Sequence, residues 1–374
     1  MSHDRNDQGD IGGNHVAATA QSTLQLSPAQ IRQEVEDVLR SHLEERASGM
    51  DGEPPMPQEL LRMMDAYVLK GGKRVRSLLC VAGWHAARGQ GPVQPVIRVA
   101  ASLEMFHASA LLHDDVMDDS ELRRGRPTAH RALARFHSGH PEAVRLGVSA
   151  TILLGDLALA WSDHLVNTAG LTSQQREAAG TVIDAMRTAT AYGQYRDLTA
   201  AHQGTLRADE ALFIARYKTA RYTVETPLLL GAALAGADAD VREQLRDFAV
   251  PLGVAFQLRD DLLGVYGDPE KTGKSRSEDI RDGKCTLLAS IAVAAVAPDE
   301  AARLRELLGD RDLDAAGEAE ARRLMEQSGA RAAVEARISG LRDEALGVLR
   351  TASFPSAVVD DLRVLAQSVT ARAA

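Results

Sequence analysis

Apolar positions recur along most of the chain at the three- and four-residue spacing of amphipathic helices. The first 26 residues lack this periodicity, and we expect them to form a disordered tail. Ser27 and Pro28 have the N-cap and first-turn chemistry that begins a helix, which should extend to about Arg46. Later helical patterns cover residues 96–118, 172–203, 208–234 and 238–266.

The pattern favours helices over sheets throughout the chain. No segment alternates apolar and polar residues for long, and no turn signal separates two β-branched runs. We therefore predict an all-α fold, a single large bundle of roughly a dozen helices around a central cavity, occupying residues 27–374. Pro251 lies inside an apolar helical pattern, so we expect a kink or a helix break near Val250.

The composition of the chain argues against some classes of protein and predicts a cellular compartment. The net charge of −9 argues against a general nucleic-acid binder. Cys80 and Cys285 are the two cysteines, and their separation predicts neither a metal site nor a disulfide framework. The polar N-terminus does not resemble a signal peptide, and no run of eighteen apolar residues predicts a transmembrane helix. We expect a cytoplasmic protein.

Four aspartates within six residues form the most unusual feature of the sequence. Asp114, Asp115, Asp118 and Asp119 lie at the C-terminal end of a predicted helix, where Asp114 and Asp118 share a face. Carboxylate oxygens are the ligands that Mg²⁺ prefers, commonly together with substrate phosphates. The alternative for this segment alone is a solvated acidic helix end.

A second acidic cluster ends another long predicted helix. Asp260 and Asp261 are adjacent, Gln257 lies one turn before them, and Asp268 follows. Facing helices of a bundle can direct two such sets into one cavity. There they could hold several Mg²⁺ ions bridged by a polyphosphate, unless the two clusters are unrelated helix ends.

Cationic residues suited to a diphosphate occur near these clusters. Lys73 and Arg76 follow Gly71-Gly72 at a predicted helix N-terminus, which is a favourable site for an anion. Arg123 and Arg124 follow the first acidic cluster. Further candidates, each weak by itself, are Lys218, Lys274 and Lys284.

A Glu-x-x-His pair raises a different kind of metal site. Glu104 and His107 have the spacing found in di-iron carboxylate bundles. Such a site needs two of these pairs, and no other histidine has a glutamate three residues before it. The di-iron interpretation is therefore the weaker one.

Six motifs in order resemble the trans-isoprenyl diphosphate synthase (polyprenyl synthetase) family over about residues 65–290. They are GGKRVR, HASALLHDDVMDDSELRRGRPT, GQYRDL, YKT, FQLRDD and GKSRSEDIRDGK. The resemblance implies an isoprenoid synthase-like fold and a Mg²⁺-dependent prenyltransferase that forms homodimers. Such an enzyme condenses isopentenyl diphosphate with an allylic diphosphate, head-to-tail and in trans geometry, and releases pyrophosphate.

The resemblance also implies roles for individual residues. It assigns several Mg²⁺ ions to Asp114, Asp115, Asp118, Asp260 and Asp261. It assigns isopentenyl diphosphate to Lys73, Arg76, His107 and Arg124. It assigns the allylic diphosphate to Arg123, Lys218, Gln257 and Lys274. The catalytic set comprises the five aspartates with Arg123 and Lys218, and Asp119 should be dispensable.

One position departs from the family pattern. The third acidic position of the second motif, commonly aspartate in the family, is Gly264. Asp268 lies about one turn further along the chain. The sequence thus leaves open which group completes the second metal site.

Product length should depend on the floor of the cavity, one turn before Asp114. Ser109 and Ala110 are small there, whereas in this family a bulky aromatic at this place ends chain growth early and gives short products. Phe106, one turn deeper, is the other candidate for the stop. We predict a product like geranylgeranyl diphosphate, with farnesylgeranyl or longer diphosphates as the alternative.

Two other functions compete with chain elongation. A class I terpene cyclase would share the fold and the first acidic motif, but it would carry an Asn/Ser/Glu-type second motif. A catalytically silent partner subunit that only binds prenyl diphosphates would be expected to lose aspartates or arginines from its motifs. The complete first motif and the GGKRVR segment favour the synthase.

Overall fold

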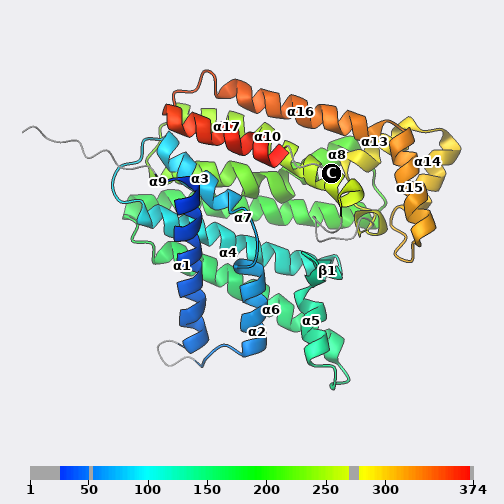
Figure 1. Ribbon diagram of the computed structural model, residues 1–374, viewed down its shortest axis with the longest axis horizontal. Coiled ribbons are helices and arrows are strands. Elements are labelled where there is room, and N and C mark those ends of the chain that lie inside the picture. The colour runs from blue at the N-terminus through cyan, green and yellow to red at the C-terminus, as the bar shows by residue number, and fades with distance from the viewer. Residues whose placement is uncertain (1–25, 50–53, 269–277, 371–374) are drawn as a thin grey trace, which may run out of the picture.

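The computed structural model describes residues 26–49, 54–268 and 278–370, and these residues are almost entirely helical, as predicted (Figure 1). The first nine α-helices are α1 (Pro28–Ser48), α2 (Gln58–Val68), α3 (Val75–Ala86), α4 (Gln94–Met117), α5 (Ala129–Phe136), α6 (Ala143–Asn167), α7 (Ser173–His202), α8 (Ala208–Ile214) and α9 (Thr226–Leu234). The others are α10 (Ala239–Tyr266), α12 (Glu278–Arg281), α13 (Leu287–Ala295), α14 (Pro298–Leu307), α15 (Ala315–Gln327), α16 (Ala330–Val348) and α17 (Ser356–Thr370). The predicted dozen was therefore too few, because the C-terminal part divides into more short helices than its apolar pattern suggested.

Side-chain caps fix the start of several long helices. The Ser27 hydroxyl accepts a hydrogen bond from the backbone N–H of Gln30, whose side chain returns to the Ser27 backbone. Thr172 and Gln175 form the same reciprocal capping box at the start of α7. Each box satisfies N–H groups that lack a partner in the first helical turn. The predicted start at Ser27-Pro28 is confirmed.

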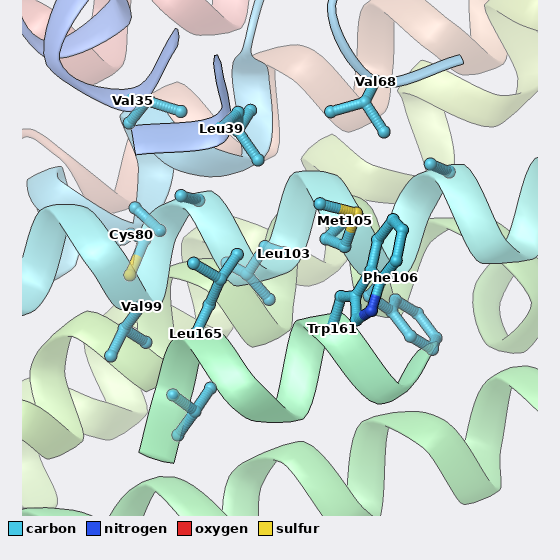
Figure 2. Close-up of a cluster of buried hydrophobic side chains, with 14 of the residues drawn as sticks. Val35, Leu39, Val68, Cys80, Val99, Leu103, Met105, Phe106, Trp161 and Leu165 are labelled. Carbon is cyan, nitrogen blue, oxygen red and sulfur yellow. The ribbon is translucent and has the colours of Figure 1, made fainter. Parts of the chain in front are cut away.

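The helix α4 runs through the middle of the main hydrophobic core. Figure 2 shows Val99, Leu103 and Met105 of α4 among apolar side chains from α1, α2, α3 and α6. A second core forms where α10 packs with α13 to α16, and α16 and α17 lie along one side of the bundle (Figure 1). The described residues thereby place the C-terminal ends of α4 and α10 around the same interior space.

The helix α10 continues through Pro251, so of the two predicted alternatives the break near Val250 is wrong and the kink stays a prediction. A proline inside a helix removes one backbone hydrogen bond, and tertiary packing can offset that loss. The packing here is close, because a Cβ added at Gly253 would lie 2.9 Å from the Cβ of Ala220. The facing segment is η1, a π-helix at Ala215–Glu225 that joins α8 to α9.

A short hairpin follows α4 and was not predicted. Strands β1 (Leu122–Arg123) and β2 (Arg126–Pro127) pair antiparallel across Arg124 and Gly125, both of which have positive φ. Positive φ at both turn residues is the geometry of the tightest hairpins. Arg126 and Pro127 therefore belong to a strand, and α5 begins at Ala129.

By length and composition alone, α4 and α6 are apolar enough to cross a membrane. The helix α4 owes this composition to its central place, since 72% of its most apolar window is buried inside the bundle. The corresponding window of α6 is 33% buried, and Val144 and Leu153 of α6 are exposed. These features are weak evidence for a membrane location.

Candidate active site

A cavity of about 990 Å³ opens between the C-terminal ends of α4 and α10. This volume is at the upper end for small-molecule sites. Most of the residues singled out from the sequence line it: Lys73, Arg76, Phe106, His107, Ser109, Ala110, Asp114, Arg123, Arg124, Lys218, Gln257, Asp260, Asp261, Gly264 and Lys284. Asp115 and Asp118 do not line it, and Lys274 lies outside the described residues.

Asp114 faces the cavity at the end of α4. Its Oδ1 lies 3.0 Å from Nζ of Lys218, and its Oδ2 lies 3.8 Å from Nη2 of Arg123. Burial alone would raise the pKa of Asp114, but Lys218, Lys284 and Arg123 outweigh it and lower that pKa. Asp114 is therefore a carboxylate under all ordinary conditions.

Asp115 points away from the cavity into the protein. It has no exposed surface, and it accepts hydrogen bonds from the Tyr67 hydroxyl at 2.5 Å and from Nε of Arg123 at 2.8 Å. Its two oxygens are thus fully engaged by protein donors. This geometry does not support the prediction that Asp115 is a metal ligand; it makes Asp115 the anchor of Arg123.

Two lysines from the second half of the chain contact the first acidic cluster. Lys218 of η1 lies between Asp114 and Asp197, with 2.5 Å from its Nζ to Oδ2 of Asp197. Lys284 lies 2.9 Å from Asp118 and 3.6 Å from Asp279. Burial favours the neutral amines, but the neighbouring carboxylates prevail and raise the pKa of both lysines.

Sequence reasoning missed Asp197 and Asp279, although both lie in motifs that were singled out. Asp197 is the aspartate of GQYRDL on α7, and it is buried beside Lys218. Asp279 belongs to GKSRSEDIRDGK and lies on α12 at the cavity wall. An acidic residue within a polar motif was the available signal in each case.

Asp261 is buried close to other carboxylates, and the contact that offsets its negative charge comes from a neutral amide. It accepts a 2.7 Å hydrogen bond from Nε2 of Gln257. Burial, with the nearby charges of Asp279, Asp260 and Asp197, raises the pKa of Asp261 to about 8 despite that hydrogen bond. A divalent cation at this place would offset the electrostatic repulsion among these neighbouring carboxylates.

The donor set fits Mg²⁺ held in part by a substrate. Asp114, Asp260, Asp261 and Asp279 offer hard oxygen ligands to one cavity. Within the described ranges, no three acidic, histidine or cysteine side chains converge as a complete metal site. An ion here would need further oxygens, which diphosphate groups supply, and Mg²⁺ is commonly bound in this way.

The other side of the cavity is strongly cationic. Arg76 donates a 3.0 Å hydrogen bond to the Thr223 hydroxyl, and its guanidinium lies 4.7 Å from the centre of the Tyr222 ring. Nδ1 of His107 lies 3.3 Å from the Tyr222 hydroxyl. Burial and the arginine charges, Arg76 foremost, hold the pKa of His107 well below its usual range, so the ring is neutral.

Arg124 completes this cationic wall. Its side chain lies against the backbone of Gly71, where an added Cβ would be 3.4 Å from Nη1, and it donates to the carbonyl of Lys70. Burial, Arg123 and Arg74 lower the pKa of Arg124. The group therefore lies among like charges, as expected where an anion binds.

The helix α3 begins at Val75 rather than near Lys73, because Arg74 takes the left-handed N-cap conformation. The Arg74 side chain instead lies 3.6 Å from the buried Glu104. Glu104 also accepts a 3.0 Å hydrogen bond from the Ser77 hydroxyl. These contacts give Glu104 a role in ordering the cationic wall, not the di-iron role considered above.

The floor of the cavity is formed by α4, α6 and α7. Ser109 and Ala110 line it, and the Phe106 ring packs edge-on against Tyr222 with 5.8 Å between centroids. Arg187 of α7 lies 5.9 Å from the centre of the Phe106 ring and forms a 2.7 Å ion pair with Asp163. Sequence reasoning missed Arg187, because an arginine on an amphipathic helix carries no signal that it closes a cavity.

Comparison with known proteins gives a consistent result. The sequence profile of the family described as polyprenyl synthetase matches residues 57–326. A geranylfarnesyl diphosphate synthase of Aeropyrum pernix is 33% identical over 226 residues, which are 60% of this chain and 67% of that protein. A farnesyl diphosphate synthase of Geobacillus stearothermophilus is 31% identical over 277 residues, which are 72% of this chain and 86% of that one.

The solved structures include a similar protein with ligands. A geranylgeranyl pyrophosphate synthase of Corynebacterium glutamicum, crystallised with isoprenyl diphosphate and magnesium, superimposes with a TM-score of 0.88. It is 35% identical, and the match covers 93% of this chain and 100% of that one. The predicted all-α fold therefore has a close counterpart among known structures.

Proposed function

This chain belongs to the polyprenyl synthetase family and is a prenyltransferase that elongates a prenyl diphosphate; we propose that it makes geranylgeranyl diphosphate from isopentenyl diphosphate and an allylic diphosphate. One observation carries the proposal. The cavity has an acidic side at Asp114, Asp260 and Asp261 and a cationic side at Arg76 and Arg124. Two diphosphates can be held there at once, one through metal ions and one by arginines directly.

The acidic side suits the allylic diphosphate. Family members generally use Mg²⁺, which Asp114, Asp260 and Asp261 would hold in this cavity. When bound, the metal would supply positive charge that offsets the charge developing on the leaving pyrophosphate. Lys218 and Arg123 lie beside Asp114, where they could donate hydrogen bonds to the oxygens of the allylic diphosphate. We assign several ions to this site, with Gln257 and Lys274 as further allylic ligands.

The cationic side suits isopentenyl diphosphate. Arg76 and Arg124 present fork-shaped donors, and Lys73 adds a point charge at the cavity wall. The neutral His107, hydrogen-bonded to Tyr222, lies between this wall and the cavity floor and can donate without adding charge.

The described residues account for the remaining demands of the reaction. Departure of pyrophosphate leaves an allylic cation that water would quench, and the apolar floor at Phe106 and Ala110 excludes water. The double bond then attacks the cation and a carbon–carbon bond forms. The new cation loses a proton, for which the released pyrophosphate is an available base. No side-chain nucleophile is required at any step. The cavity has to position the two substrates and to stabilise the charge of the leaving pyrophosphate.

Product length is proposed from the depth of the floor. Ser109 and Ala110 leave room one turn below Asp114, and the Phe106 ring with Arg187 limits the space beneath. Names of relatives do not decide the matter, since they range from farnesyl to geranylfarnesyl diphosphate synthases. A twenty-carbon product is the length we propose, with twenty-five carbons as the alternative.

We also propose that residues 27–374 act as one unit that forms a homodimer in the cytoplasm. The exposed apolar residues Leu146 and Leu153 are seven positions apart on α6 and so share a helix face that a second copy could cover. Tyr192 and Tyr195 of α7 are two-thirds exposed and extend the apolar surface available to it. Sedimentation of the purified protein measures this assembly directly.

A labelled assay tests the main proposal. Purified protein is mixed with Mg²⁺, radiolabelled isopentenyl diphosphate and geranyl or farnesyl diphosphate, and products are identified by mass spectrometry. The synthase releases pyrophosphate only when isopentenyl diphosphate is present. Release without it, accompanied by hydrocarbon, would identify a terpene cyclase, and no release with any primer would identify a silent subunit.

A further inference from the structure

The last turn of α10 contains a glycine at the third position of the second acidic motif. The space beside this glycine is filled by a carboxylate from elsewhere in the chain. A Cβ built on Gly264 would lie 1.9 Å from Oδ2 and 2.9 Å from Cγ of Asp279. Neither distance is possible for real atoms, so any larger residue at position 264 would displace the Asp279 carboxylate.

Asp279 faces the same cavity as the second acidic cluster. It lines the cavity together with Asp260, Asp261 and Gly264, although it comes from the short helix α12 and not from α10. Its side chain is largely buried, with 19% of its surface exposed. Nζ of Lys284 lies 3.6 Å from one of its oxygens and 2.9 Å from Asp118, so Lys284 links Asp279 to the first cluster.

The other candidate for the missing carboxylate is less suitable. Asp268 follows Gly264 by about one helical turn in the sequence, but it comes after the end of α10. Among the described residues that line the cavity, Asp268 does not occur.

We propose that Asp279 supplies the third carboxylate of the second metal site and that Gly264 is the residue that admits it. This inference rests on the proposed function, which places Mg²⁺ and a diphosphate in the cavity. A carboxylate can contribute to Mg²⁺ either by direct ligation or through one of the waters that this ion retains. In both cases the Asp279 carboxylate replaces the one that is missing at Gly264, so the metal site keeps its negative charge.

Metal binding can be measured apart from catalysis. Mg²⁺ is titrated calorimetrically into the full-length protein in the presence of inorganic pyrophosphate. The variants are Asp279→Asn, which removes the charge, and Gly264→Ala, which displaces the carboxylate without changing any charge. Matched controls are Asp268→Asn and Gly340→Ala; Gly340 is an exposed glycine of α16 whose added Cβ would meet nothing within 4 Å.

Both test variants are expected to weaken Mg²⁺ binding at least tenfold, and both controls should bind as the parent does. Thermal unfolding of each variant confirms that the fold persists. The inference is overturned if Asp279→Asn binds Mg²⁺ like the parent, or if Asp268→Asn loses binding instead. Either result leaves the proposed function standing when the parent still condenses isopentenyl diphosphate, so the two proposals fail separately.

Discussion

The Tyr67 hydroxyl lies 2.5 Å from Oδ2 of the fully buried Asp115 and also accepts a 3.1 Å hydrogen bond from the backbone N–H of Ala129. Asp115 in turn accepts hydrogen bonds from Arg123. These contacts join α2, α4, the hairpin and α5 behind the cavity wall. The position of Arg123, and through it the charge offered to a substrate, therefore depends on a tyrosine outside every motif singled out in the sequence.

Replacing Tyr67 by Phe tests this dependence. The change removes the donor to Asp115 and the acceptor for Ala129 while keeping the ring, so we expect a loss of about 1–3 kcal/mol in the free energy of unfolding. We also expect a several-fold higher KM for the allylic substrate. Urea unfolding and steady-state kinetics measure the two effects. The exposed Tyr192 provides the control, since Tyr192→Phe should change neither quantity.

Substitutions of the adjacent residues Asp114 and Asp115 should have different effects, the first mainly on turnover and the second mainly on stability. Asp114→Asn removes a carboxylate that faces the cavity, so turnover should fall at least about 100-fold. Its loss of stability should be smaller than that of Asp115→Asn, because Asp197 still pairs with Lys218. Asp115→Asn leaves the largely buried Arg123 without its closest charge partner, which should cost about 3–5 kcal/mol of stability. Parallel denaturation and turnover measurements separate the two. Equal losses of activity at unchanged stability would contradict the anchor role of Asp115.

Product length should respond to the floor residues in both directions. Ser109→Phe fills the space one turn below Asp114, so mass spectrometry should show shorter products. Phe106→Ala removes the ring that packs on Tyr222, and it should allow at least one further five-carbon addition. An unchanged product from both variants would place the floor elsewhere in the cavity.

A histidine cluster far from the cavity predicts a loss of stability in acid. Burial, followed by the charges of Arg46, His164 and Arg98, lowers the pKa of His42 to about 4. The unfolded chain therefore binds more protons than the folded chain between about pH 6.5 and 4, so stability falls as the pH falls through this window.

Replacing His42 by Gln should remove this contribution. The unfolding free energy of the parent should fall by about 1–3 kcal/mol more than that of His42→Gln between pH 7 and pH 4. Urea denaturation at closely spaced pH values measures the difference. His202 is exposed at the end of α7, and His202→Gln should retain the acid sensitivity of the parent.

Sequence patterns predicted the helical fold because apolar spacing and capping residues act locally, as at Ser27 and Thr172. The acidic and basic motifs likewise named most of the side chains that line the cavity. Orientation could not be predicted, because adjacent residues on a helix face different neighbours. Asp114 faces the cavity and Asp115 faces the core, and only tertiary packing distinguishes them.

Contacts that depend on distant parts of the chain escaped prediction for the same reason. The filling of the space at Gly264 by Asp279 requires α12 to fold back onto α10. The helix α10 continues through Pro251 where it packs against η1, a segment that ends more than twenty residues earlier in the chain. The hairpin was missed because its turn residues, Arg124 and Gly125, lack the Asn-Gly or Asp-Gly signal that usually predicts it.

The hydrogen bond from Arg76 to Thr223 joins residues 147 positions apart. Lys284 reaches Asp118 across a similar stretch of sequence. Contacts of such long range form late in folding, since the intervening chain must first be ordered. During refolding, helical signal should therefore return well before catalytic activity. Activity then reports the docking of the two halves of the chain, and no fragment that lacks either half can contain a working site.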